Sequence, residues 1–240
     1  MSGLTLLYTL FAYVAIAVFL VGFLARIWKY ATTPSPLKIP LTPAPVNSVG
    51  VVYRMVQEVG FFKSLFYSNR VIWIGGYLMH IALLITIVKH LRFFFKTTPT
   101  ALAWITSFEI YVGFIFFGAL AFLFLMRLVI DRTYYLSLMQ DYVLLILLML
   151  IAATGILTKY YVRTDIIKVK QFVMGLVQFR PEAIPGDPIF IIHFTLVLLL
   201  LIYFPFSKLM HSGGIFFSPT RNQVDDAREV RHVTPWAVKG

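Results

Sequence analysis

Five apolar stretches dominate the chain, and each is long enough to cross a bilayer as a helix. A hydrocarbon core about 30 Å thick requires roughly 20 apolar residues in helical conformation. Stretches of this kind lie at about residues 4–25, 71–95, 108–130, 140–158 and 188–210. Because lipid cannot hydrogen-bond an exposed backbone, spanning segments are restricted to helices or closed barrels, and continuous apolar runs of this length favour helices. The sequence therefore predicts an all-α, integral membrane bundle of five transmembrane helices.

Composition agrees with this prediction and excludes several classes of function. Only 13% of the 240 residues are charged, whereas a soluble domain carries about 25%. The net charge is +11, but the basic residues lie in loops beside apolar stretches, which is typical of membrane topology and not of a nucleic-acid partner. The chain has no cysteine, so it provides no ligands for an iron–sulfur cluster and no covalent haem attachment. No small-residue cleavage site follows the first stretch, which we interpret as a retained span.

The distribution of Lys and Arg predicts the orientation. Of the 21 basic residues, 13 lie in the loops 26–70 and 127–132 and in the segment 208–240. The positive-inside rule then places the N-terminus in the periplasm and the C-terminus in the cytoplasm, in a multi-pass protein of the cell inner membrane. We expect a membrane domain over 1–212, which includes the cytoplasmic loop 26–70, and a cytoplasmic tail over 213–240.

Two segments on the predicted cytoplasmic side are candidates for docking. The loop 32–47 is rich in proline and is expected to be extended. From 49 to 70, apolar and charged residues alternate with helical periodicity, which predicts an amphipathic helix on the membrane surface or against a partner protein. The tail after Ser212 lacks the periodicity of a core element and is typical of a segment that docks on something else.

Four histidines lie in the apolar stretches. His193 and His211 are separated by 18 residues, which is five turns of a helix, so both imidazoles are expected on one face, about 27 Å apart. His80 and His90 in the second stretch are separated by ten residues, or about 15 Å. An imidazole is costly to bury in lipid without a partner, so intramembrane histidines indicate function.

The order of the spans predicts how these histidines pair. The second and fifth spans are three crossings apart and run antiparallel, which places His90 beside His193 toward the outer face and His80 with His211 toward the inner face. Two facing histidines at each level are what the iron of a b-type haem requires as axial ligands. The distance along the helix axis from His80 to His90 is shorter than the distance from His193 to His211. A bend at Pro205 is expected to compensate for part of this difference.

The same residues also have purely structural interpretations. A single intramembrane histidine often only hydrogen-bonds a neighbouring helix. Met79 and Met210 adjoin histidines but point about 100° away from them, so we interpret both as packing residues. His232 lies in the polar tail and is assigned no role.

The spacing of the four histidines, with the run Phe204-Pro-Phe-Ser-Lys-Leu-Met-His211, resembles the gamma subunit of respiratory nitrate reductase. The flanking segments 36–45 and 216–223 resemble a branch of that family from sulfur metabolism, the cytochrome b subunit of the complex associated with dissimilatory sulfite reductase. The resemblance implies a five-span cytochrome with two haem b groups, the outer held by His90 and His193 and the inner by His80 and His211. It also implies electron transfer between a membrane quinone, such as menaquinone, and a cytoplasmic iron–sulfur subunit of an oxidoreductase complex.

Two positions depart from the family pattern near the expected quinone site. Lys89 replaces the glycine that precedes the outer ligand, and it is a candidate contact for a quinone oxygen or a haem propionate. The third span begins without the lysine of the nitrate enzyme, and Glu109 is the nearest ionisable group there.

The sequence is also compatible with two other classes of function. One is a proton or ion transporter, in which the intramembrane histidines, Glu109 and Arg127 form a relay. The other is a scaffold without haem that holds the other subunits of a complex. The few polar residues in the spans and the absence of an interrupted repeat argue against a transporter.

Overall fold

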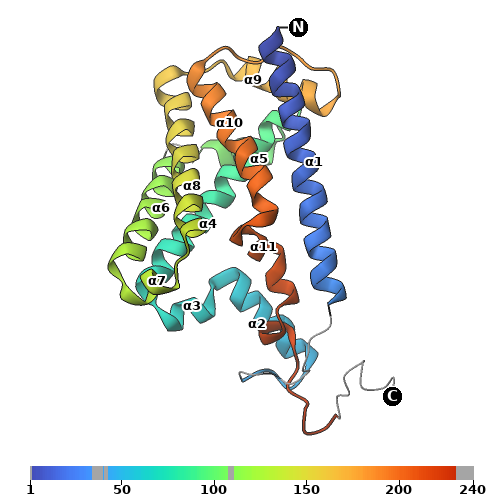
Figure 1. Ribbon diagram of the computed structural model, residues 1–240, viewed down its shortest axis with the longest axis vertical. Coiled ribbons are helices and arrows are strands. Elements are labelled where there is room, and N and C mark those ends of the chain that lie inside the picture. Colours follow the sequence, from blue (N-terminus) through green and yellow to red (C-terminus); the bar gives the residue numbers. More distant parts are fainter. Residues whose placement is uncertain (1, 34–39, 41–42, 108–110, 231–240) are drawn as a thin grey trace. The chain divides into compact units, whose positions relative to one another are not determined.

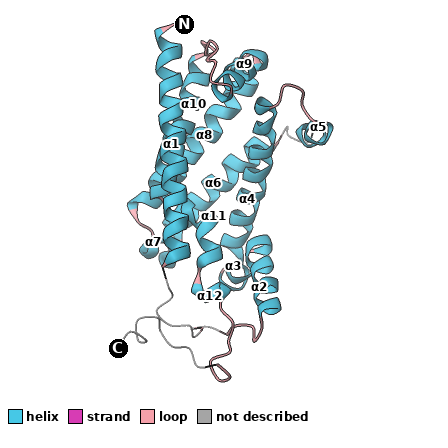
Figure 2. Ribbon diagram, turned by 90° about the vertical axis from the view of Figure 1, so that its right-hand side faces the viewer, coloured by secondary structure: helices cyan, strands magenta, loops and turns pink. Residues whose placement is uncertain are grey.

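The computed structural model describes residues 2–33, 40, 43–107 and 111–230 (Figure 1). These residues are helical or in loops, and they include no strand (Figure 2). The chain divides into two compact units. The first unit joins residues 1–19 to 71–203, and the second joins residues 20–70 to 204–240. Each unit is described by itself.

Five helices of the described chain are long and apolar enough to cross a membrane, which confirms the predicted all-α architecture of five spans. The predicted ends of the first and fifth spans, at residues 25 and 210, differ most from the structure, where α1 ends at Thr32 and α10 ends at Tyr203. Residues 108–110, where the third span was expected to begin, lie outside the described residues, together with Glu109. The five helices are α1 (Gly3–Thr32), α4 (Arg70–His90), α6 (Val112–Val129), α8 (Met139–Leu157) and α10 (Pro188–Tyr203).

Several short helices connect the spans. The first unit contains η1 (Leu91–Phe94), α5 (Thr100–Ser107), α7 (Asp131–Leu136), η2 (Thr158–Val162) and α9 (Ile166–Val177). The sequence analysis predicted no helix where α9 lies, between the fourth and fifth spans. Asp165 caps this helix, because its carboxylate accepts the backbone N–H of Ile167 at 2.9 Å.

One hydrophobic cluster of the first unit joins α1, α9 and α10. Ala12, Phe172 and Leu198 are buried within it. Two tyrosines of α1 fix the neighbouring helices: Tyr8 Oη lies 2.8 Å from Thr195 Oγ1, and Tyr13 Oη donates to the carbonyl of Leu176 at 3.0 Å. The amphipathic helix α9, too short to span a bilayer, is thereby held against α1 and α10 by its apolar face.

A second cluster of the first unit joins α4, α6 and α8 and contains buried Ala82, Phe116 and Leu148. A Cβ added to Gly75 would lie only 2.5 Å from the Phe122 ring, so this glycine allows the close approach of α4 to α6. The helix α8 contacts both α6 and α10 (Figure 1). The two clusters together hold the helices that carry His80, His90 and His193.

The outward surface of the spans is apolar. Leu7, Leu84 and Val129 expose 61%, 62% and 70% of their surface, and they are typical of the many exposed leucines and valines on these helices. Exposed apolar surface of this extent must be covered by lipid or by another protein. The chain is accordingly a multi-pass membrane protein.

In the second unit the predicted amphipathic helix over 49–70 is wrong as a single element. It is broken into α2 (Ser48–Phe61) and α3 (Lys63–Ser68), because Phe62 adopts a left-handed conformation with φ 51°. The Glu58 carboxylate accepts the backbone N–H and the hydroxyl of Ser64 across the break, which holds the two helices in place. Asn47 caps α2 by accepting the Gly50 N–H at 2.8 Å.

The predicted helix over 188–210 is also interrupted. After α10 the chain continues as η3 (Phe204–Phe206), η4 (Lys208–Met210), α11 (His211–Gly214), η5 (Ile215–Phe217) and α12 (Pro219–Asn222). Pro205 lacks an N–H and cannot continue the α-helical ladder, so the expected bend becomes a change to 3₁₀ geometry. The prediction of one regular helix of five turns between His193 and His211 is therefore wrong.

The segment that follows His211 packs on α2 within the second unit. The Arg221 guanidinium lies 2.8 Å from the Glu58 carboxylate and also donates to the Ser64 hydroxyl. The Asp225 N–H donates to the Pro45 carbonyl at 2.9 Å. Residues up to 225 are thus docked on the chain's own amphipathic helix and proline-rich loop.

Candidate functional site

Two of the four histidines face each other in the first unit. His90 ends α4 and His193 lies in the second turn of α10, and their ring centroids are 6.5 Å apart with an interplanar angle of 27°. His90 is exposed and His193 is partly buried. The structure thereby brings together the pair that the sequence predicted for the outer level.

All four of these histidines direct Nδ1 at a backbone carbonyl. His80 Nδ1 lies 2.7 Å from Gly76 O, and His90 Nδ1 lies 2.7 Å from Thr86 O, each one turn back along α4. His193 Nδ1 lies 3.1 Å from Ile151 O, and His211 Nδ1 lies 2.6 Å from Lys208 O. A carbonyl only accepts, so Nδ1 carries the proton and Nε2 carries the lone pair. This is the tautomer that a metal-ligating histidine requires.

The helix α8 provides the surroundings of His193. Thr154 Oγ1 lies 3.0 Å from His193 Nδ1 and donates its own proton to the Leu150 carbonyl at 2.7 Å, so it accepts from the imidazole. A Cβ added to Gly155 would lie 3.2 Å from His193 Cε1. The glycine therefore provides the space in which the ring lies, and the threonine with Ile151 orients it.

The other predicted site residues lie at different places in the two units. His80 lies in α4 of the first unit and His211 begins α11 in the second unit, so the inner pairing stays a prediction. Lys89 is partly buried in the last turn of α4, next to His90. Met79 packs against the α4, α6 and α8 cluster, and Met210 is buried in the second unit, which agrees with their interpretation as packing residues.

Arg127, one residue of the alternative relay, contacts the turn between α6 and α8, whereas Glu109 lies outside the described residues. Arg127 donates to Ser137 Oγ at 2.8 Å and lies 3.9 Å from the buried Asp141 carboxylate. Asp141 in turn accepts the Leu138 N–H at the start of α8. These contacts fix the turn between α6 and α8, which is a structural role.

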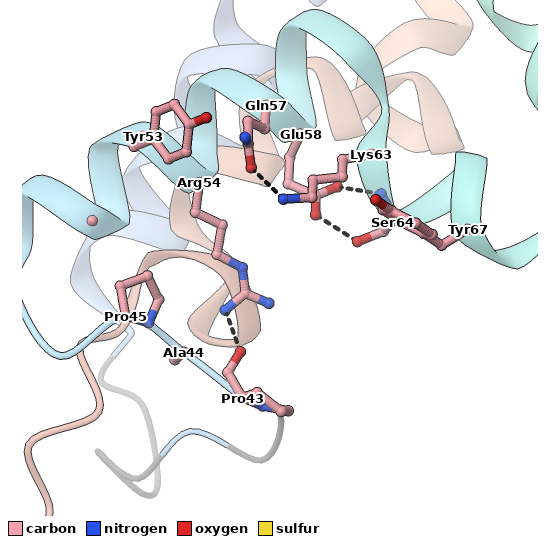
Figure 3. A pocket seen from close by; sticks show the side chains of 11 residues that line it. Pro43, Ala44, Pro45, Tyr53, Arg54, Gln57, Glu58, Lys63, Ser64 and Tyr67 are labelled. Carbon is pink, nitrogen blue, oxygen red and sulfur yellow. Dashed lines mark hydrogen bonds between the residues drawn. The ribbon is translucent and has the colours of Figure 1, made fainter.

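A pocket of about 700 Å³ lies in the second unit (Figure 3). Residues 43–45 of the proline-rich loop form one wall, and α2 and α3 form the other. Arg54 donates to the Pro43 carbonyl at 3.1 Å and Lys63 to the Gln57 side chain at 2.6 Å, and both cations border the pocket. Because Glu58 is paired with Arg221, the pocket carries net positive charge.

Sequence reasoning missed the residues that surround the histidines. Thr154 and Gly155 are about 39 residues from His193 in the chain, and no motif links them. The only available signal was a polar residue beside a small one in the middle of an apolar span, which is common at helix contacts of every kind.

A five-span helical membrane protein in which two of the spanning helices bring two imidazoles together has the arrangement expected of membrane cytochrome b subunits. The model of the nitrate reductase gamma subunit family matches residues 39–231, and the chain belongs to that family. This confirms the family resemblance stated from the sequence.

Two relatives from archaea are similar over nearly the whole chain. A protein of Archaeoglobus fulgidus named Hdr-like menaquinol oxidoreductase cytochrome b-like subunit is 36% identical, over 93% of this chain and 81% of the relative. A protein of the same name from Archaeoglobus profundus is 30% identical, over 93% of this chain and 80% of the relative.

The residues present fit the haem that such a class implies. One iron bound by two imidazoles holds each ring centroid about 3 Å away, since metal–nitrogen bonds are about 2 Å long. The 6.5 Å separation of His90 and His193 is close to twice that value. The space left by Gly155 and the Nδ1–H bonds of both rings agree with ligation through Nε2.

Proposed function

We propose that the protein is the cytochrome b subunit of a membrane redox complex and transfers electrons between the menaquinone pool and a cytoplasmic iron–sulfur subunit through two haem b groups. The observation that carries the proposal is the apposition of His90 and His193, with the Nδ1 atom of each ring bonded to a carbonyl. The names of the two relatives support menaquinol as the quinone partner and oxidation of menaquinol as the direction.

In this proposal, His90 and His193 hold the outer haem iron, and His80 and His211 hold the inner one. When bound, haem iron supplies reversible one-electron transfer. The task of this chain is to orient the ligands. Thr154 and the Ile151 carbonyl keep the Nδ1 proton of His193 in place, and the Thr86 carbonyl does the same for His90. Such bonds make an imidazole a stronger ligand and prevent it from turning away.

The predicted cytoplasmic side supplies the surface for the partner. The pocket bordered by Arg54 and Lys63 is cationic, which suits acidic side chains of an iron–sulfur subunit. The segment 215–225 packs on α2. We therefore propose that this segment and α2 together form the docking surface. The inner membrane remains the proposed location.

Visible and paramagnetic resonance spectra of the purified protein test the proposal. We expect two low-spin b haems per chain. His193→Ala and His90→Ala are expected to remove the outer haem, and His80→Ala and His211→Ala the inner one, so each variant retains about half of the haem. Intact protein that folds in the membrane but contains no extractable haem would contradict the proposal and favour the scaffold.

A transporter would behave differently in the same experiments. Proteoliposomes containing the protein are expected to show quinol-dependent reduction of the haems and no uncoupled proton or ion flux. Flux without haem reduction would favour the alternative function.

A further inference from the structure

We propose that Arg92 is the binding site for a propionate carboxylate of the haem held by His90 and His193. The inference rests on the proposed function and deepens it, because it assigns a residue to the charged edge of the cofactor. Nothing in the sequence pattern distinguished Arg92 from the other basic residues near the ends of the spans.

The Arg92 side chain contains a buried donor without an acceptor. Its Nε is buried and has no hydrogen-bond partner among the described residues of the protein. A buried N–H of a charged group left in this way costs free energy, so natural proteins rarely leave one unsatisfied. The missing acceptor must therefore belong to a bound group and not to a side chain of the protein. A carboxylate matches the planar array of donors on a guanidinium best.

The position of Arg92 is fixed relative to the outer histidines by Phe93. The Phe93 ring centroid is 5.9 Å from that of His90 and 5.1 Å from the Arg92 guanidinium carbon. Because both distances end on one ring, the guanidinium lies at most about 11 Å from the His90 imidazole. Phe93 packs against the α1, α9 and α10 cluster, and η1 contacts α9, so this arrangement is held by the core of the unit.

The chemistry of a b-type haem supplies the missing acceptor. Its two propionates leave one edge of the porphyrin, several ångström from the iron, and they are charged. They therefore point out of the apolar interior toward the nearest polar boundary. Arg92 lies two residues beyond the ligand His90, immediately after α4 has ended, which is the side on which such carboxylates would emerge.

The charge on Arg92 affects the midpoint potential of the outer haem. A propionate paired with a guanidinium is neutralised, and an unpaired one opposes the addition of an electron to the iron. Arg92→Gln is therefore expected to lower the midpoint potential of the outer haem, with about a tenfold change in the reduction equilibrium, or about 59 mV for one electron. Arg92→Lys retains the charge and is expected to restore most of the potential.

The test is a potentiometric titration of haem absorbance in the purified wild-type protein and in Arg92→Gln, Arg92→Lys and Arg180→Gln. Arg180 is exposed and follows α9 in the same unit, so its variant controls for the loss of one positive charge. The result expected is a lowered outer potential in Arg92→Gln alone, with haem content unchanged.

Three results would overturn the inference. In the first, the midpoint potential of the outer haem is equal in Arg92→Gln and Arg180→Gln. The proposed function would then stand, and the role of Arg92 would be limited to its contact with Phe93. A slower reduction by a menaquinol analogue with an unchanged potential would assign Arg92 to the quinone instead. A wild-type protein without haem would overturn the proposed function, and this inference with it.

Discussion

Gly155 and His193 approach each other so closely that a single methyl group on the glycine would lie 3.2 Å from the imidazole Cε1. The two residues come from α8 and α10, and the contact fixes how far the ring can extend from its own helix. A larger side chain at this position would occupy the space of the imidazole.

Gly155→Val is therefore expected to remove the outer haem and to lower the haem content by about half. The branched side chain occupies the volume of the ring, and α8 cannot move away without disrupting its packed core. The measurement is the haem-to-protein ratio of the purified variant. Gly118→Val is the matched control, because a Cβ at Gly118 would contact nothing within 4 Å. Equal haem loss in both variants would show a general effect of branched residues.

Thr154→Val is expected to retain the outer haem and to raise its midpoint potential. The valine has nearly the shape of threonine but cannot accept the His193 Nδ1 proton, so the imidazole becomes a weaker donor to the oxidised iron. A bond of this kind is worth up to roughly 1.4 kcal/mol, or about 60 mV for one electron. Thr158→Val, whose hydroxyl donates to the Thr154 carbonyl at 2.7 Å and not to the imidazole, is the control for the redox titration. A shift in both variants would argue against a specific role.

Arg221→Gln is expected to destabilise the second unit by about 1–3 kcal/mol. The variant removes the cation that pairs with the buried Glu58 carboxylate and leaves its hydrogen bonds from Ser64. The value is below that of a fully buried pair, since the Arg221 side chain is 30% exposed. Faster tryptic cleavage at Arg228 and a lower Tm are the readouts. The double variant with Glu58→Gln is expected to recover part of the loss, because it removes the uncompensated charge.

Charge removal at the pocket tests the docking surface. Arg54→Gln combined with Lys63→Gln is expected to weaken co-purification of the iron–sulfur partner by about tenfold at low salt while both haems stay bound. Arg26→Gln combined with Lys29→Gln removes the same charge from the end of α1 and serves as the control. Unchanged co-purification with the first pair would exclude this pocket as a contact.

Lys89→Met retains the volume of the side chain and removes its charge. If Lys89 contacts the quinone, haem reduction by a menaquinol analogue is expected to slow by about tenfold, the effect of roughly 1.4 kcal/mol on a barrier. Stopped-flow reduction with haem content as the internal standard measures it. Kinetics equal to those of the wild type would assign Lys89 to the membrane interface.

The number and position of the spans were determined by the sequence alone, since apolar length and backbone hydrogen bonding in lipid allow few other solutions. The pairing of His90 with His193 was predicted for the same reason: an odd number of crossings makes the two helices antiparallel. The family was also recognisable, because the histidine spacing and the run that ends at His211 are local patterns.

Only the tertiary structure decided the surroundings of those histidines. The helix α9 exists as a packed element because its apolar face is buried against α1 and α10, which no local pattern required. Thr154 and Gly155 acquire their roles from contacts between helices that are distant in the chain. The interruption after Tyr203 removes the straight-helix register of His193 and His211, because the missing N–H of Pro205 changes the local hydrogen bonding. Periodicity determines which residues can share a helix face, whereas packing determines which neighbour each of them meets.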